Sequence, residues 1–101
     1  FGFAMLGRIV ANVSGMPYAQ YIRERVLLPL GMTSTTMEAR TVPASRLAHG
    51  YRLQDGQWLE EPPLADGSFG AMGGMLTSSA DLSRWVGLML SAWPPRDGPE
   101  H

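Results

Sequence analysis

Apolar residues recur at helical spacing at the start of the chain, over residues 1–14. This spacing predicts a helix, and Gly15 is placed to end it, because glycine is the usual residue just past a helix C-terminus. The apolar stripe is wide, which indicates burial on more than one side. It comprises Phe3, Met5, Leu6, Ile9, Val10 and Val13.

A second helix is expected between two prolines, Pro17 and Pro29. Proline suits the first helical position, where its missing N–H costs nothing, and the residue before a proline is pushed out of the helical region. Residues 23–25 (Arg-Glu-Arg) form the solvated side, and residues 30–32 (Leu-Gly-Met) are expected to form a turn with apolar anchors. The apolar face comprises Tyr18, Tyr21, Ile22 and Val26.

The clearest periodicity lies between residues 78 and 93. Ser78 is a good N-cap and Asp81 follows three residues later, as in a capping box. The apolar positions of this helix are Leu82, Trp85, Val86, Met89, Leu90 and Trp93. Residues 93–101 contain three prolines, so residues 94–101 are predicted to be a coil tail.

The middle of the chain predicts one β-hairpin. Residues 50–53 and 57–59 contain apolar side chains and flank Asp55-Gly56, a strong hairpin signal. Residues 33–48 are weakly patterned, with a short helical turn expected over residues 43–47. Residues 60–66 are expected to be an irregular connection.

Composition narrows the function classes. The chain has 101 residues, 45% of them hydrophobic and 17% charged, with a net charge of −1, so it lacks the basic footprint of a nucleic-acid-binding protein. All eight basic residues are arginine; the missing lysine excludes a Walker A loop, a Schiff-base lysine and a Ser-x-x-Lys pair within these residues. Without cysteine there is neither a disulfide nor a thiolate nucleophile, and the compartment stays open.

The glycine-rich segment, residues 67–74, leads into the third helix. Bare backbone N–H groups before a helix attract anions, but no G-x-G-x-x-G and no preceding apolar strand supports phosphate binding. We expect a tight loop in which glycines adopt positive φ and the backbone passes close to a neighbour.

The remaining polar residues predict little chemistry. His49 is interpreted as a partly buried histidine bonded to backbone, because a general base needs a positioned partner. Glu60-Glu61 is interpreted as a solvated loop pair, and the two distant histidines make a metal site improbable. We expect no cofactor and no membrane segment. Residues 1–13 hold Arg8 and Asn12, and they are too few to span a bilayer.

Three stretches together resemble the serine β-lactamase-like superfamily: residues 1–18, residues 26–35 with Pro-Leu-Gly-Met, and residues 73–85 with Gly-Gly-x-x-x-Ser-x-x-Asp-Leu-x-Arg-Trp. The superfamily includes class C β-lactamases, penicillin-binding DD-peptidases and β-lactamase-like esterases. The resemblance implies an α+β fold, of which this chain is a mostly helical portion with one small β-hairpin. Residues 1–93 would then form part of the domain.

The resemblance also implies a serine acyl-transfer hydrolase acting on a small-molecule ester or amide, with the substrate (β-lactam, D-Ala peptide or carboxylic ester) undecided. The family's Ser-x-x-Lys and Tyr-x-Asn motifs have no match here, so no catalytic residue carries over. The substrate-cleft wall of relatives corresponds to Gly70, Ala71, Met72, Gly73 and Gly74. In class C enzymes a tyrosine near the Gly73 position contacts the acyl side chain, and Gly73 either widens that pocket or satisfies a positive φ.

The alternative from another class is a non-catalytic helical binding or interaction module. Because the chain opens within a helical pattern and without Met, we expect it to be part of a longer protein and inactive by itself. Its wide apolar stripes predict that the isolated chain is marginally stable or self-associates.

Overall fold

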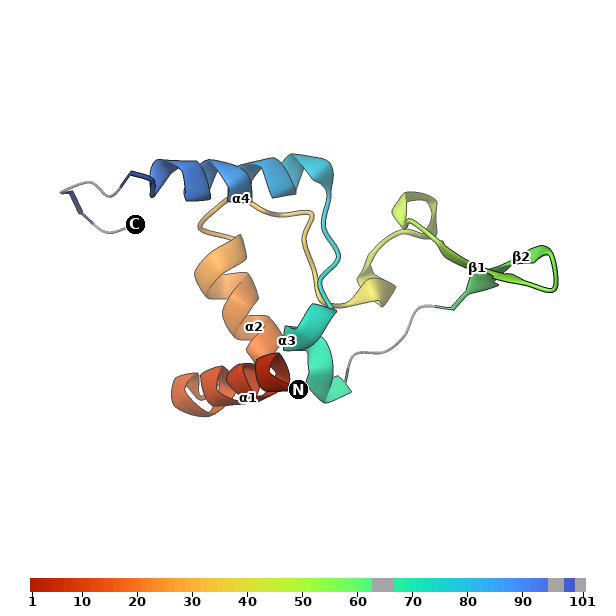
Figure 1. Cartoon of the computed structure of the whole chain (residues 1–101). Helices are drawn as coiled ribbons and strands as arrows, with labels where there is room; N and C mark the ends of the chain where they lie inside the picture. Colours follow the sequence, from red (N-terminus) through yellow and green to blue (C-terminus); the bar gives the residue numbers. More distant parts are fainter. Residues whose placement is uncertain (63–66, 95–97, 100–101) are drawn as a thin grey trace.

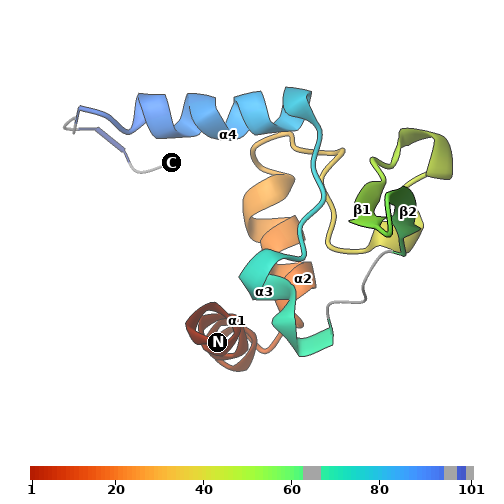
Figure 2. The ribbon, with the colours of Figure 1, turned by 45° about the vertical axis from the view of Figure 1, so that its right-hand side comes forward.

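A computed structural model describes residues 1–62, 67–94 and 98–99. Three helices, α1 (Gly2–Ser14), α2 (Tyr18–Ile22) and α3 (Gly70–Gly73), pack against one another. In two views α1 and α3 lie together at one end of α2, α4 (Ser79–Ser91) lies toward the other end, and the hairpin stands away from the helices (Figure 1, Figure 2). The molecule measures 57 × 30 × 24 Å, which is elongated for its length.

The first two helices largely follow the sequence pattern. α1 ends at Gly15, whose φ of 68° places it in the left-handed region and whose N–H donates to the Ala11 carbonyl. Pro17 is the N-cap of α2 instead of its first residue. α2 does not run on to Pro29, because residues Arg23–Leu27 form a π-helical turn and a turn follows. Exposed residues 23–25 confirm the predicted solvated side.

The hairpin is confirmed. Strands β1 (Gly50–Gln54) and β2 (Gln57–Glu61) pair antiparallel, with Leu53 opposite Trp58. Asp55 and Gly56 both have positive φ, 51° and 75°, as a two-residue turn matching the strand twist requires. Every residue of both strands is exposed.

The connections are built from short helical turns. Ala39–Thr41 and Ala44–Arg46 are 3₁₀ turns, the second within the predicted residues 43–47. The glycine-rich segment is not the expected loop, because Gly67–Phe69 forms a 3₁₀ turn and Gly70–Gly73 forms α3. Of its glycines Gly67 has a positive φ of 51°, whereas Gly74 has a φ of −82°.

Helix α4 begins as predicted, with the Ser78 hydroxyl accepting a hydrogen bond from the Asp81 N–H at 3.2 Å. The other half of the capping box is absent, since the Asp81 carboxylate binds elsewhere. The predicted tail, residues 94–101, lies mostly outside the described residues. None of the described helices has the length and apolar character needed to cross a bilayer.

The core of the described part is small. Leu27 and Met32 are its buried large apolar side chains, at 3% and 4% exposure. Two polar residues, Thr35 and Asp81, are also buried, at 7% and 5% exposure. Apart from the half-buried Val10, the residues of the apolar stripes of α1 and α4 are exposed, from 37% at Trp85 to 84% at Val13. Most of the molecule's apolar surface is therefore not covered by the described residues.

Candidate substrate-cleft wall

An open groove of about 1170 Å³ lies between α1, the connection over residues 37–47 and the glycine-rich segment. One face of α1 forms its first side, where the lining residues recur at helical spacing. The lining residues of α1 are Ala4, Met5, Gly7, Arg8 and Ala11, and Phe1 lines the groove just before the helix. Ala4, Gly7 and Ala11 are small, whereas Phe1, Met5 and Arg8 bring larger side chains to this side of the groove.

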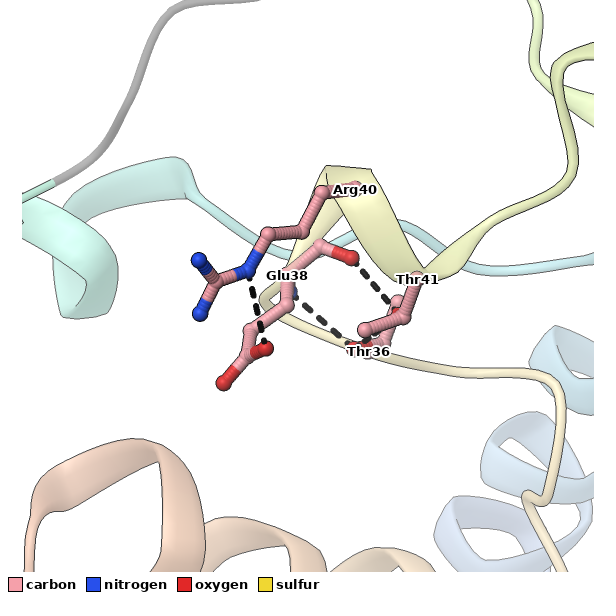
Figure 3. A network of polar contacts seen from close by, with 4 residues as sticks. All are labelled: Thr36, Glu38, Arg40 and Thr41. Atoms are coloured by element: carbon pink, nitrogen blue, oxygen red, sulfur yellow. Dashed lines mark hydrogen bonds and ion pairs between the residues drawn. The ribbon is translucent and has the colours of Figure 1, made fainter.

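The second side of the groove is the connection that follows Thr36. A network holds it, in which the Thr36 hydroxyl accepts from the Glu38 N–H at 3.0 Å and the Thr41 hydroxyl donates to the Glu38 carbonyl at 2.7 Å (Figure 3). Glu38 also pairs with Arg40 at 3.6 Å, with both side chains largely exposed. The charged groups of this side therefore face water at the rim.

The third side is the start of α3. Gly70 and Ala71 line the groove, whereas Met72, Gly73 and Gly74 are not among its lining residues. Gly73 is exposed, and a Cβ built on it would meet nothing within 4 Å. Because Gly73 is helical, the interpretation that it satisfies a positive φ is wrong.

The close approach of α3 to α1 depends on one glycine of α1. A Cβ built on Gly7 would lie 2.5 Å from the Ala71 Cβ, a distance that real Cβ atoms do not reach. Gly7 is the one buried residue of α1. Backbone contact at this point therefore fixes where α3 stands beside the groove.

Two of the stretches that carry the family resemblance, residues 26–35 and residues 73–85, meet at the first turn of α4. Asp81 Oδ2 accepts hydrogen bonds from the Ser34 N–H at 2.8 Å and from the Thr35 hydroxyl at 2.7 Å. The Thr35 and Thr77 hydroxyls lie 2.9 Å apart, within hydrogen-bond distance. We call Ser34, Thr35, Thr77 and Asp81 the Asp81 cluster.

A second contact joins the same two motifs. Gly31 has a φ of 72°, and a Cβ built on it would lie 3.2 Å from Arg84 Nη1. Only glycine combines this backbone conformation with room for the guanidinium. The glycine of Pro-Leu-Gly-Met and the arginine of Asp-Leu-x-Arg-Trp are thus contact partners.

The remaining chemical candidates lie on the hairpin, away from the groove. His49 is exposed and its Nδ1 lies 2.7 Å from Glu60 Oε1, so the expected partly buried histidine bonded to backbone is wrong. Glu60 and Glu61 belong to β2 instead of a loop, and Glu61 pairs with Arg52 at 2.8 Å. Among residues 1–62, 67–94 and 98–99, no group of three or more acidic or histidine side chains could hold a metal ion.

Comparison with known proteins identifies the family of this chain. The family model described as "Beta-lactamase" matches residues 1–98, so the chain belongs to the beta-lactamase family. It is 32% identical over 93 residues to "Protein flp" of Staphylococcus aureus (strain MW2), covering 92% of this chain and 18% of that protein. It is 29% identical over 94 residues to "Beta-lactamase-like protein 2" of Dictyostelium discoideum, covering 92% of this chain and 17% of that protein.

A solved structure shows the same arrangement. The octameric penicillin-binding protein homologue from Pyrococcus abyssi superposes with a TM-score of 0.73 and 30% identity, covering 89% of this chain and 20% of that one. The chain therefore has the fold of part of a penicillin-binding protein homologue, mostly helical with one hairpin. It spans less than a fifth of the length of the curated relatives named above.

Sequence reasoning missed the Asp81 cluster and the role of Gly7. Asp81 fits a local capping box, and its actual partner Ser34 lies 47 residues away in the sequence. The run of four hydroxyl residues, 33–36, was the available signal, since such a run supplies donors for a buried acceptor. Gly7 carries no comparable signal, because a glycine inside a helix does not reveal its neighbour.

Proposed function

We propose that this chain forms part of a serine acyl-transfer hydrolase, acting on a β-lactam, a D-Ala peptide or a carboxylic ester. The match of the family model over residues 1–98 is the observation that carries the proposal. Such chemistry needs an activated serine and donors for an oxyanion. The sequence has no lysine, so the Ser-x-x-Lys turn of the family must come from outside these residues.

The chain's own part in this function is structural support for the substrate. An acyl-enzyme needs its acyl group held beside the nucleophile, and residues 70–74 supply a wall for it. Gly70 and Ala71 leave that wall nearly bare where it borders the groove, and Gly73 leaves it bare on its exposed side. The wall therefore leaves room for a bulky acyl group.

Hydrolysis assays on the full-length protein that carries this chain test the reaction class. A chromogenic cephalosporin, a D-Ala-D-Ala peptide and a series of nitrophenyl esters cover the three substrate classes. We expect turnover of at least one class, abolished by alanine in place of the serine of its Ser-x-x-Lys turn. No turnover of any class would refute the hydrolase, and it would favour the helical interaction module, for which the exposed apolar face of α4 is the observation.

Substitutions at Gly73 test the wall. Gly73 does not line the groove, so this test concerns the acyl pocket that the resemblance to class C enzymes places at Gly73. Gly73→Tyr should lower kcat/KM for large acyl groups more than for small ones, because the ring occupies space that glycine leaves open. Gly73→Ala is the control, since its Cβ meets nothing within 4 Å and should alter neither selectivity nor melting temperature. Equal losses for all substrates, accompanied by a lower melting temperature in both variants, would contradict the role of the wall.

A further inference from the structure

The Asp81 carboxylate is buried at 5% exposure, yet it takes no part in the chemistry proposed above. Ser34 and Thr35 both donate to Oδ2, so one oxygen receives a backbone N–H and a hydroxyl from the same loop. A buried carboxylate is costly to keep unless its hydrogen bonds are made. The loop over residues 33–36 is therefore fixed to the first turn of α4.

The same loop is bound to the segment that leaves α3. Thr36 and Leu76 exchange two backbone hydrogen bonds, N–H to carbonyl at 2.9 Å and at 2.8 Å. Beside this bridge, the Thr35 hydroxyl reaches Thr77 at 2.9 Å. The segment between α3 and α4 is held at this end, and α3 is held at its other end by the contact of Ala71 with Gly7.

Thr36 also belongs to the network that holds the opposite side of the groove. Its hydroxyl accepts from the Glu38 N–H at 3.0 Å, and the Thr41 hydroxyl lies 3.4 Å from it (Figure 3). One residue therefore connects the segment that follows the wall, at Leu76, with the connection over residues 37–47. The position of Thr36 is fixed in turn by the preceding residue, Thr35, whose hydroxyl donates to Asp81.

We propose that Asp81 is a positioning residue that sets the separation between the two sides of the groove, acting through Thr35 and the Thr36–Leu76 bridge. This inference rests on the proposed function where it concerns substrate. The property required of Asp81 is an acceptor oxygen at the Oδ2 position, and the negative charge is not required. Asparagine can place its amide oxygen there, whereas alanine leaves the Ser34 N–H and the Thr35 hydroxyl without this acceptor.

Amide hydrogen exchange on the full-length protein tests the positioning independently of activity. In Asp81→Ala, protection of the Thr36 and Leu76 N–H groups should fall together, and in Asp81→Asn both should stay protected. Ser83→Ala, on the exposed side of the same helix, is the control and should change neither. Unchanged protection in Asp81→Ala, or equal loss in Asp81→Asn, would overturn the proposal.

If Asp81→Ala does not fold, a second pair of variants, at Thr35, tests the positioning role of Asp81. Thr35→Val removes the hydroxyl that connects Asp81 with Thr77 and keeps the branched shape, whereas Thr35→Ser keeps the hydroxyl. Exchange at Leu76 should accelerate in Thr35→Val and stay slow in Thr35→Ser. The reverse order, or no difference, would overturn the proposal.

Kinetics on the same variants test the effect on substrate. Asp81→Ala should lower kcat/KM by roughly tenfold to a hundredfold, mainly through KM for bulky acyl groups, because misplaced binding surfaces cost this much. Asp81→Asn should remain within about threefold, since a neutral acceptor keeps roughly half the strength of a charged one. An inactive unsubstituted protein would refute the proposed function, while the exchange result would still decide the role of Asp81.

Discussion

At the scale of single residues, two contacts explain why particular residue types stand in the motifs of this chain. Asp81 joins the loop after α2 to the start of α4, and Arg84 lies against Gly31 one turn further along. The sequence predicted Asp81 near the helix start, because capping is local. It could not predict the partners, because these depend on how segments far apart in sequence pack.

Gly7 gives the sharpest prediction at this scale. Gly7→Ala should destabilise the fold by up to about 2 kcal/mol net, because overlap of the added methyl group with the Ala71 Cβ costs about 1–3 kcal/mol. The higher helix propensity of alanine offsets roughly 1 kcal/mol of this cost. Denaturant unfolding of the unsubstituted protein and of Gly7→Ala measures the difference in their free energies of unfolding.

Gly87→Ala in α4 is the matched control. Its Cβ would meet nothing within 4 Å, so the substitution should be neutral or stabilising by about 0.5–1 kcal/mol. Equal effects of the two substitutions would show that Ala71 of α3 does not pack against α1 at Gly7.

At the scale of elements, local signals predicted the two long helices and the hairpin. Gly15, Ser78 and Asp55-Gly56 mark ends and turns by their own backbone chemistry, and each stands where it was expected. The π-helical turn at residues 23–27 and the helical turns at residues 67–73 were not predicted. Both segments are short. The segment over residues 67–73 is also rich in glycine, whose low helix propensity argues against a helix.

The cap of α4 yields a prediction for that element. Ser78→Ala should lower the free energy of unfolding by about 1 kcal/mol, because the Asp81 N–H loses its acceptor. Ser78→Asp should retain most of the stability, since aspartate caps equally well and suits the positive end of the helix. Loss of stability in Ser78→Asp equal to that in Ser78→Ala would show that the hydroxyl does more than cap.

At the scale of the whole molecule, the exposed apolar surface is the dominant feature. Phe3, Leu6, Met89 and Trp93 are between 47% and 74% exposed, although their spacing predicted buried faces. The family assignment and the groove could not be predicted from periodicity. An apolar stripe on a helix indicates that the face is covered, but it does not identify the segment that covers it. The resemblance of the motifs identified the family where the pattern could not.

This surface predicts that the isolated chain of 101 residues associates with itself. Sedimentation velocity should show a weight-average mass that rises with concentration. Replacing Trp85 and Leu90 on α4 by glutamine should reduce the rise, whereas glutamine at Ser83 should not. A monodisperse monomer with a sharp, cooperative melt would contradict this expectation and would favour the stand-alone interaction module.

We propose that these residues support an acyl-enzyme but do not form it. Intact-protein mass spectrometry after incubation with a penicillin, and separately with a nitrophenyl ester, measures this directly in the isolated chain and in the full-length protein. We expect an adduct of one acyl group on the full-length protein with at least one of the two reagents, and no adduct on the isolated chain with either. An adduct on the isolated chain that survives denaturation, and that disappears when a single one of its serines is replaced by alanine, would contradict it.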